Sequence, residues 1–165
     1  MKILITGGKS AAALKLIKAF SNDQVILGDY GDVPTFSSTA YTMISLGERN
    51  DDITAHQLLN VCLDLQVEVL IPIHYFEVAA LSRSMQLFEE FGIRVLLPEI
   101  SVLPELLQSA KQTTAAWAVY KEGQLLYAAQ EGEVPVVEHS ERLNGVFHLL
   151  ETSIGIRPVL YTIAD

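Results

Sequence analysis

The stretch MKILITGGKSAAAL at residues 1–14 constrains the fold most, because it joins an apolar run, a glycine turn and a helix start. The run ILI at residues 3–5 is short and partly β-branched, which suits a central strand covered on both faces of a sheet. Gly7 and Gly8 then allow a tight turn, and Ser10 is a favourable N-cap for the helix that follows. This order of elements predicts an α/β fold.

The glycine turn also predicts a ligand site. A turn that leads into a helix directs backbone N–H groups and the positive end of the helix dipole at one point, where an anion such as a phosphate can bind. We therefore expect a cofactor to contact the turn, through Gly7, Gly8, Lys9, Ser10 and Ala11. The alternative is that the two glycines only let the helix pack closely against its strand.

Length and charge limit the classes of protein. A chain of 165 residues, half of them hydrophobic, is long enough for one core and short for two domains. Twenty acidic against eleven basic residues give a net charge of −9, which argues against nucleic acid and anionic membranes as partners. Cys62 is the single cysteine, and residues 1–14 resemble neither a signal peptide nor a membrane span. We expect a cytoplasmic protein.

The pattern alternates between strand and helix up to Pro98. Such alternation predicts parallel strands with right-handed crossovers, here a three-layer, Rossmann-like, doubly wound and mainly parallel sheet of about five strands. Residues 31–40 are rich in Gly, Pro, Ser and Thr and predict an exposed loop. The strands are expected at residues 2–6, 24–28, 41–46, 67–73 and 94–97, and the helices at 10–20, 53–65 and 75–91, with Asp51 and Asp52 capping the second helix.

An irregular α+β tail is expected beyond Pro98. We divide the chain into a Rossmann-like domain at residues 1–120 and a C-terminal extension at residues 121–165. The tail is expected to contain helical pieces at 102–107, 110–120 and 140–151 and strands at 125–129 and 158–163.

Asp29 supports a dinucleotide as the alternative ligand. It follows the second strand about twenty residues after the glycines, where dinucleotide-binding folds place the carboxylate that binds ribose. The glycine fingerprint is incomplete, because Thr6 stands where its first glycine belongs. A P-loop is excluded, since Ile3 occupies the position of its first glycine, and no Tyr-x-x-x-Lys pair of a short-chain reductase occurs.

Pro72, His74 and Glu77 are the candidate substrate-binding residues. They lie at or just after the strand at 67–73, and open α/β sheets bind ligands at the carboxyl ends of their strands. Glu77 could equally stabilise the first turn of a helix through its charge. Two potential ligands do not make a metal site, so none is expected, nor is a catalytic residue. We interpret His56, His139 and His148 as structural or exposed.

Five segments, MKILITGGKSAAAL, VILGDY, VEVLIPIHYFEVAAL, FGIRVLLPE and SAKQTT, resemble the N-terminal pre-ATP-grasp domain of ATP-grasp ligases, the superfamily of carbamoyl-phosphate synthase and biotin carboxylase. The resemblance covers roughly residues 1–120 and implies a Rossmann-like sheet that helps to bind the acceptor substrate. It also implies that Lys111 contacts an ATP phosphate, although Ala110 replaces the acid that precedes this lysine in the family. The later VPVVEHSERLNGVFHLLETSIGIRPVLYTIAD looks like the entry to a grasp domain without its lysine.

Three hypotheses of function follow. The first is a nucleotide- or small-metabolite-binding module related to ATP-grasp ligases but without the catalytic grasp domain, which would take ATP, ADP or another small anionic metabolite. Within a larger enzyme it would serve a carboxylate–amine ligase, as a split subunit. The second is an NAD(P)-binding oxidoreductase, and the third is that side chains fill the pocket. Apolar residues between Leu125 and Ile163 predict a homodimer or a separate ATP-grasp subunit as partner.

Overall fold

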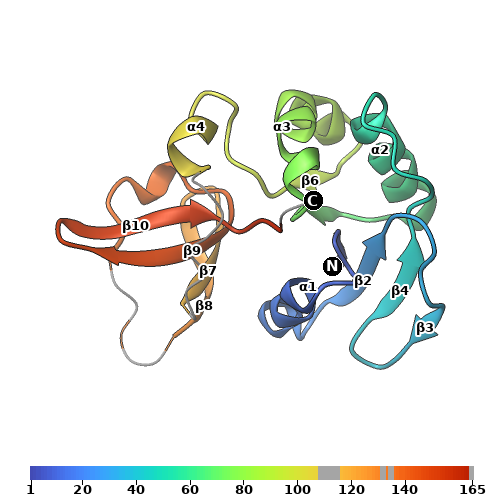
Figure 1. The fold of residues 1–165 in the computed structure, drawn as a ribbon, viewed down its shortest axis with the longest axis horizontal. Helices are drawn as coiled ribbons and strands as arrows, with labels where there is room; N and C mark the ends of the chain where they lie inside the picture. Colours follow the sequence, from blue (N-terminus) through green and yellow to red (C-terminus); the bar gives the residue numbers. More distant parts are fainter. Residues whose placement is uncertain (108–115, 131–132, 134–135, 164–165) are drawn as a thin grey trace.

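The computed structural model describes residues 1–107, 116–130, 133 and 136–163. These residues form a mixed α/β structure with two sheets, one of six mostly parallel strands and one of four antiparallel strands (Figure 1). The first sheet takes its strands from residues before Pro98 and the second from residues after it. The change of pattern in the sequence thus marks a change of architecture.

The six-stranded sheet has the order β3-β4-β2-β1-β5-β6. All neighbours are parallel except β3 and β4, which are antiparallel. The central strand β1 pairs on one side with β2 and on the other with β5. The strands are β1 (Lys2–Ile5), β2 (Gln24–Asp29), β3 (Phe36–Ser37), β4 (Thr42–Ser45), β5 (Val69–Ile71) and β6 (Arg94–Val95).

The five strands expected from the sequence are confirmed, each within two residues at either end. The expectation of a loop over residues 31–40 is wrong in one part, because β3 lies inside this stretch as an edge strand. Phe36 and Tyr41 hold this hairpin through a ring contact of 5.6 Å. Two residues of strand between Pro34 and Ser38 are too few to produce an alternating pattern in the sequence.

Helices lie on both faces of the six-stranded sheet (Figure 1). On one face Leu4, Ile26 and Leu70 pack with the apolar residues of α2 and α3. On the other face Ile3 and Ile5 pack with α1 and also with apolar residues of the second sheet. The helices are α1 (Ala11–Leu16), which continues as the 3₁₀ turn η1 (Ile17–Phe20), α2 (Thr54–Leu65), α3 (Tyr75–Glu90) and α4 (Leu103–Leu106).

The start of α2 differs from the expectation. Asp51 and Asp52 do not cap this helix, because its N-cap residue is Ile53, which makes no capping hydrogen bond through its side chain. Asp51 instead pairs with Arg49, at 2.7 Å between Oδ1 and Nε. Thr54 donates from its hydroxyl to the carbonyl oxygen of Asn50 at 3.2 Å and so fixes the entry to the helix.

The antiparallel sheet has the order β10-β9-β7-β8 and corrects two expectations for the tail. The helix expected at 140–151 is a 3₁₀ turn followed by β9, whose run VFHLL is mostly buried and so gives no strand alternation. The helix expected at 110–120 is a strand from Trp117 onward, and its earlier part lies outside the described residues. The elements are β7 (Trp117–Lys121), β8 (Gln124–Ala129), η2 (Ser140–Arg142), β9 (Gly145–Thr152) and β10 (Gly155–Leu160).

The chain that leaves β10 connects the two sheets. The amide of Tyr161 still donates to the carbonyl oxygen of Val146 in β9, at 2.9 Å. Two residues later Ile163 forms a parallel bridge with His74, in which its amide donates to Ile73 and its carbonyl oxygen accepts from Tyr75. The division at residues 120 and 121 stays a prediction, and these two residues are neighbours within β7.

Among the described residues, no helix has both the length and the apolar character needed to cross a membrane.

Candidate functional site

The glycine turn between β1 and α1 is formed as expected. Gly7 has a positive φ of +70°, and Ser10 is the N-cap of α1, with its hydroxyl accepting from the amide of Ala13 at 3.2 Å. A β-carbon on Gly8 would stand 2.9 Å from Cβ of Leu27 and 3.1 Å from the backbone of the same residue. Gly8 is therefore required for the close packing of this turn against β2.

Several backbone groups of the turn are already in use. The amide of Gly8 donates to the carbonyl oxygen of Gly28 at 3.0 Å, and that of Ser10 donates to Gly7 at 2.9 Å. The amide of Lys9 donates to the Asp29 carboxylate at 3.0 Å. These three N–H groups point at the protein itself. A phosphate site at Gly7, Gly8, Lys9, Ser10 and Ala11 stays a prediction, and this geometry favours the packing alternative.

The same turn is covered by the end of the chain. A β-carbon on Gly7 would lie 2.8 Å from Cδ1 of Ile163 and 2.9 Å from Cγ1 of Ile73. The segment that leaves the antiparallel sheet thus lies against the glycine turn. Apolar side chains occupy the space that a ligand at Gly7 would need.

Asp29 and His74 meet, as their places at the ends of two strands predict. His74 Nε2 lies 2.8 Å from Asp29 Oδ1, and the Asp29 carboxylate also accepts from the amides of Lys9 and Tyr30. Burial alone would raise the pKa of Asp29, but these hydrogen bonds outweigh it and lower the pKa from its ordinary 3.8. Asp29 is therefore an ionised carboxylate held by the protein, and its predicted role in binding ribose stays a prediction.

Glu77 is completely buried beside this pair. Its carboxyl group accepts a hydrogen bond from the Thr6 hydroxyl and another from the Tyr30 hydroxyl, each at 2.6 Å. Burial raises the pKa of Glu77 to about 7, against the opposing effect of the two hydroxyl groups. The pKa of Tyr30 is raised too, first by burial and then by the Glu77 carboxylate. These groups form one polar cluster at the carboxyl ends of β1, β2 and β5.

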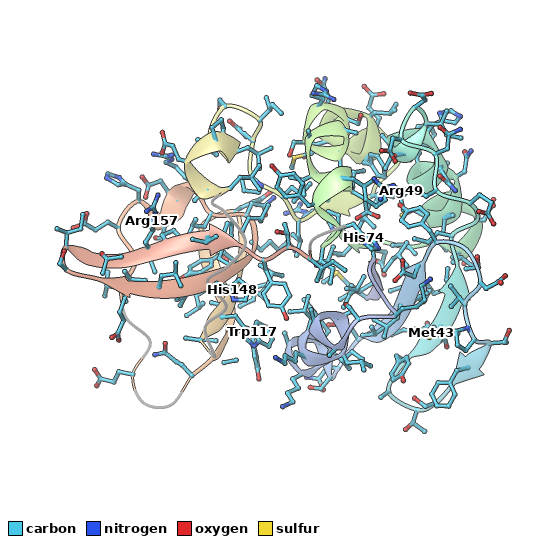
Figure 2. All side chains as sticks on the ribbon, viewed as in Figure 1. Met43, Arg49, His74, Trp117, His148 and Arg157 are labelled. Atoms are coloured by element: carbon cyan, nitrogen blue, oxygen red, sulfur yellow. The ribbon has the colours of Figure 1, made fainter. Side chains whose placement is uncertain are left out.

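Aromatic rings close this polar cluster on its outer side. The rings of Tyr30, His74 and Phe76 lie 5.2 to 5.6 Å apart, and the Arg49 guanidinium lies 3.7 Å above the ring of Phe76. Figure 2 shows Arg49 and His74 beside one another near α3. The carboxyl ends of β1, β2 and β5, where we expected a ligand, are thus occupied by side chains of the chain itself.

The remaining predicted residues are placed as follows. Pro72 is buried at the end of β5. Lys111 lies outside the described residues. Thr6 and Tyr30 belong to the polar cluster but were missed by sequence reasoning. Tyr30 directly follows Asp29, and Thr6 occupies the first position of the glycine fingerprint. The places of these two residues in the sequence could therefore have indicated that they belong to the site.

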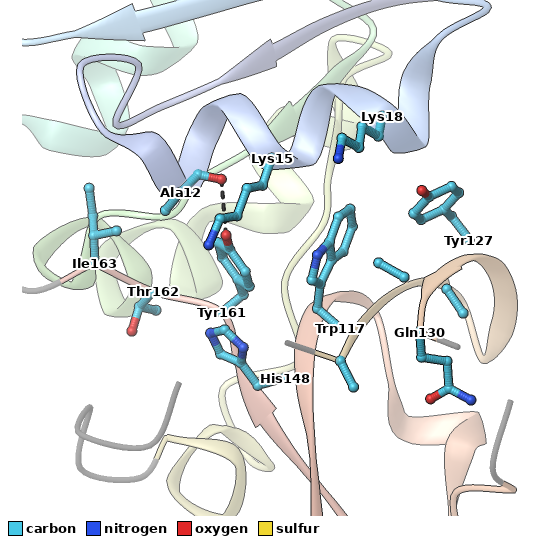
Figure 3. Close-up of a pocket in the computed structure, with 13 residues that line it drawn as sticks. Ala12, Lys15, Lys18, Trp117, Tyr127, Gln130, His148, Tyr161, Thr162 and Ile163 are labelled. Carbon is cyan, nitrogen blue, oxygen red and sulfur yellow. Dashed lines mark hydrogen bonds between the residues drawn. The ribbon is translucent and has the colours of Figure 1, made fainter. Parts of the chain in front are cut away.

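A cleft of about 880 Å³ lies on the other face, between α1 and the antiparallel sheet (Figure 3). One wall comes from α1 and η1, another from β7 and β8, and the third from β9 and the segment after β10. The lining residues are Ala12, Lys15, Lys18, Ala116, Trp117, Tyr127, Ala128, Ala129, Gln130, His148, Tyr161, Thr162 and Ile163.

The base of the cleft is aromatic. The rings of Trp117 and Tyr127 lie 5.2 Å apart, and the His148 imidazole stacks on Tyr161 at 4.4 Å. Tyr161 also donates from its hydroxyl to the carbonyl oxygen of Ala12 at 3.0 Å, which attaches this floor to α1 (Figure 3). Flat apolar surfaces of this kind accept planar rings.

The charge of the cleft is opposite to that of the chain. Lys15 and Lys18 lie along one side of α1 and η1, and the described residues that line the cleft include neither aspartate nor glutamate. In a chain of net charge −9, this is a place where an anionic ligand meets two positive charges and, within the part of the lining that the structure describes, no carboxylate. The cleft therefore suits a small molecule that carries both a planar ring and a negative charge.

No family model and no curated protein matches the sequence. The assignment of a function thus depends on the chemistry of these two places, the occupied polar cluster and the open cleft.

The cleft was not among the sites that the sequence predicted. Its residues come from α1, β7, β8, β9 and the end of the chain, which join only when the antiparallel sheet packs beside α1. The sequence signal was indirect: Lys15 and Lys18 are three residues apart on one helical side, and Trp117, Tyr127 and Tyr161 are aromatic residues of the tail.

Proposed function

We propose that this chain is a binding module for a small anionic metabolite with a planar ring, with nucleotides such as ATP and ADP as the leading class. The ligand occupies the cleft, stacks its ring on the aromatic floor near Trp117 and Tyr127 and places its charge beside Lys15 and Lys18. One observation carries the proposal: in a strongly acidic chain, the cleft has two lysines and an aromatic floor, and no carboxylate among its described lining residues.

The volume of the cleft agrees with this class of ligand. Pockets for small molecules and cofactors typically measure about 300–1,000 Å³ and combine an apolar lining with a few polar groups. The cleft of about 880 Å³ falls within that range.

We also propose that the six-stranded sheet with its helices is a three-layer, Rossmann-like unit related to pre-ATP-grasp domains. The parallel strands follow the order β4-β2-β1-β5-β6, which is the third, second, first, fourth and fifth parallel strand along the chain. This is the order of the first five strands in doubly wound dinucleotide folds. A role beside a grasp domain of another chain rests on the resemblance of the sequence.

The NAD(P)-dependent alternative has weaker support. It needs the Asp29 carboxylate for a ribose, and this carboxylate already accepts hydrogen bonds from His74, Lys9 and Tyr30. A dinucleotide would thus have to displace internal hydrogen bonds of a buried carboxylate, which is costly.

Isothermal titration with ATP, ADP, NADH and NADPH tests the proposal. Trp117 is the only tryptophan of the chain and lines the cleft, so its fluorescence reports occupancy of this site directly. We expect heat and a change of fluorescence with ATP or ADP, and a weaker response with uncharged adenosine. Binding of NADH without a response to ATP would favour the oxidoreductase, and the absence of any response would contradict the proposed module.

A further inference from the structure

We propose that Asn144 is a deamidation site, and that its conversion to aspartate releases the antiparallel sheet from the six-stranded sheet. Asn144 lies in the short segment between η2 and β9, at the seam between the two sheets. Neither the polar cluster nor the cleft includes this residue. The inference therefore goes beyond the proposed function and does not depend on a ligand.

The side-chain amide of Asn144 connects three pieces of backbone. Its Nδ2 donates to the carbonyl oxygen of Leu97 at 2.9 Å and to that of Val95 at 3.3 Å, at the end of β6 and just after it. Its Oδ1 accepts from the amide of Glu122, in the turn between β7 and β8, at 3.2 Å. One half-buried side chain thus joins the edge of the six-stranded sheet to the antiparallel sheet.

Close packing at the seam requires a glycine directly after Asn144. Gly145 is buried, its φ is +134°, and a β-carbon on it would stand 2.9 Å from the carbonyl oxygen of Leu96. Asn144 is the only asparagine of the chain that precedes a glycine. Asparagine deamidates most readily in this dipeptide, because no side chain shields the backbone nitrogen that attacks it. The packing of the seam thus requires the sequence that makes Asn144 reactive.

Deamidation of Asn144 takes two steps. The backbone nitrogen of Gly145 attacks Cγ of Asn144, so that an N–Cγ bond forms and the Cγ–Nδ2 bond breaks. The proton of the backbone N–H leaves with Nδ2 as ammonia. Water then opens the succinimide ring at one of its two carbonyl carbons and gives aspartate or isoaspartate. Water is the only co-reactant, and no group is oxidised or reduced.

The folded state protects the site. The three hydrogen bonds of the side-chain amide oppose the rotation that brings Cγ of Asn144 to the nitrogen of Gly145. The reaction therefore proceeds from molecules in which the seam has opened, and its rate follows the population of this open state.

The product does not restore the seam. An aspartate side chain has no donor when ionised, so a carboxylate oxygen would face the two carbonyl oxygens that Nδ2 now serves. Isoaspartate also lengthens the backbone directly before Gly145, where the approach to Leu96 leaves no space. Each deamidation thus traps an opened molecule, and the seam opens in one direction only.

Hydrogen exchange followed by mass spectrometry tests the role of Asn144 in Asn144→Asp. The matched control is Asn60→Asp, which adds the same charge at an exposed position of α2. Asn144→Asp should exchange faster than the wild type at residues 94–97 and 121–124, on the two sides of the seam. Its ratio of unfolded to folded protein in urea should rise roughly 5- to 30-fold. Asn60→Asp should keep the wild-type values, and equal behaviour of the two variants would overturn the inference.

A second measurement uses the wild-type protein alone, so the test stands even if Asn144→Asp fails to fold. The protein is kept at mildly alkaline pH with and without denaturing guanidinium chloride, and peptide mass spectrometry follows deamidation at each asparagine. In denaturant, Asn144 should react faster than the other three, which are Asn22, Asn50 and Asn60. In the folded protein, the reaction at Asn144 should be much slower.

The denaturant is then removed, and ion exchange separates the deamidated molecules from the intact ones. The deamidated fraction should exchange rapidly at residues 94–97, and the intact fraction should exchange as the untreated protein does. Equal rates of deamidation in the folded and denatured protein, a faster reaction at another asparagine, or a deamidated fraction that exchanges as the intact one does would each overturn the inference. None of these outcomes bears on whether the cleft binds a nucleotide.

Discussion

The Tyr30 hydroxyl donates a hydrogen bond of 2.6 Å to Oε1 of Glu77, a carboxyl group with no exposed surface. Forty-seven residues separate the two in the chain, and the bond links the end of β2 to the first turn of α3. Burial raises the pKa of Glu77 from its ordinary 4.5 to about 7. The folded protein therefore holds a proton on this group in a range of pH where the unfolded chain has released it.

The first prediction concerns stability against pH. Between about pH 4.5 and 7 the folded state binds more protons at Glu77 than the unfolded state, so stability falls as pH rises through this window. The raised pKa corresponds to a loss of about 3 kcal/mol, and above pH 7 this contribution is constant. Asp29, whose pKa is lowered, acts in the opposite sense and only below its ordinary 3.8, where its contribution is lost on acidification.

Urea unfolding of the wild type and of Glu77→Gln between pH 5 and 8 measures this effect. The glutamine variant should lack the decrease, because its amide does not titrate. Glu89→Gln, which changes an exposed residue of the same helix, should behave as the wild type does. Equal pH profiles for the wild type and Glu77→Gln would show that Glu77 does not titrate in this window.

The second prediction concerns Gly8. Its φ is not in the left-handed region, so alanine fits the local backbone, but the new β-carbon would lie about 3 Å from both the side chain and the backbone of Leu27. We expect Gly8→Ala to lower the free energy of unfolding by about 1–3 kcal/mol. Thermal and urea unfolding measure the loss.

Gly92→Ala is the matched control for this change. Gly92 has a φ of +75° and open space around it, so its substitution costs only the backbone strain, about 1–2 kcal/mol. A loss at Gly8 smaller than that at Gly92 would mean that β2 moves away easily and that close packing is not the reason for this glycine.

The third prediction concerns the contact between Tyr161 and α1. Tyr161→Phe removes the hydroxyl that donates to the Ala12 carbonyl oxygen at 3.0 Å and leaves the ring stacked on His148. We expect a loss of about 0.5–1.5 kcal/mol in unfolding free energy. Tyr75→Phe, at an exposed tyrosine, should change stability less, and equal losses in the two variants would contradict a specific role of the Tyr161 hydroxyl.

The fourth prediction concerns the lysines of the cleft. Lys15→Ala and Lys18→Ala should each weaken ADP binding roughly three- to tenfold, because each removes a positive charge next to the anionic part of the ligand. Added salt should reduce the affinity of the wild type more than that of the double variant. Titration followed by Trp117 fluorescence measures both effects.

Arg83→Ala is the control for this pair. Arg83 is an exposed cation of α3, on the opposite face of the six-stranded sheet from α1. If this variant weakened ADP binding as much as the lysine variants do, the net charge of the protein and not the cleft would explain the affinity.

The fifth prediction concerns self-association. Many apolar residues of the tail belong to the core, among them Val146, Phe147 and Leu149, while Leu125 and Leu126 of β8 are exposed. Val136 and Ile154 are exposed as well, but Leu125 and Leu126 are neighbours on one strand, and we expect the homodimer predicted from the tail to use β8. Light scattering coupled to size exclusion should show a dimer that Leu126→Lys converts to a monomer, and a wild-type monomer at every concentration would contradict it.

The parallel sheet could be predicted from the sequence because each strand carries its own signal. The run ILI before Gly7 is apolar throughout, as a strand covered on both faces requires. The same property explains the wrong prediction at β9, where the run VFHLL is mostly apolar and buried and follows residues that form a 3₁₀ turn. A short buried run has no period that separates a strand from a helix.

The candidate sites were predictable to different extents. Asp29 and His74 could be placed at one edge because parallel strands share their carboxyl ends, but their hydrogen bond to each other leaves them engaged by the protein. The cleft could not be predicted, because Lys15 and Trp117 come to line one cleft only when the antiparallel sheet packs beside α1. Packing of this kind depends on contacts far apart in the chain, which local patterns do not report.

The central place of β1 has a consequence for how the protein is made. Ile3 pairs with Val25 on one side and with Val69 on the other, so β1, once synthesised, waits for more than sixty further residues before its second edge is paired. Pairings between distant residues of a chain form slowly, and open strand edges favour aggregation in the meantime. We therefore expect the nascent segment from β1 to β5 to be the one most in need of a chaperone during synthesis.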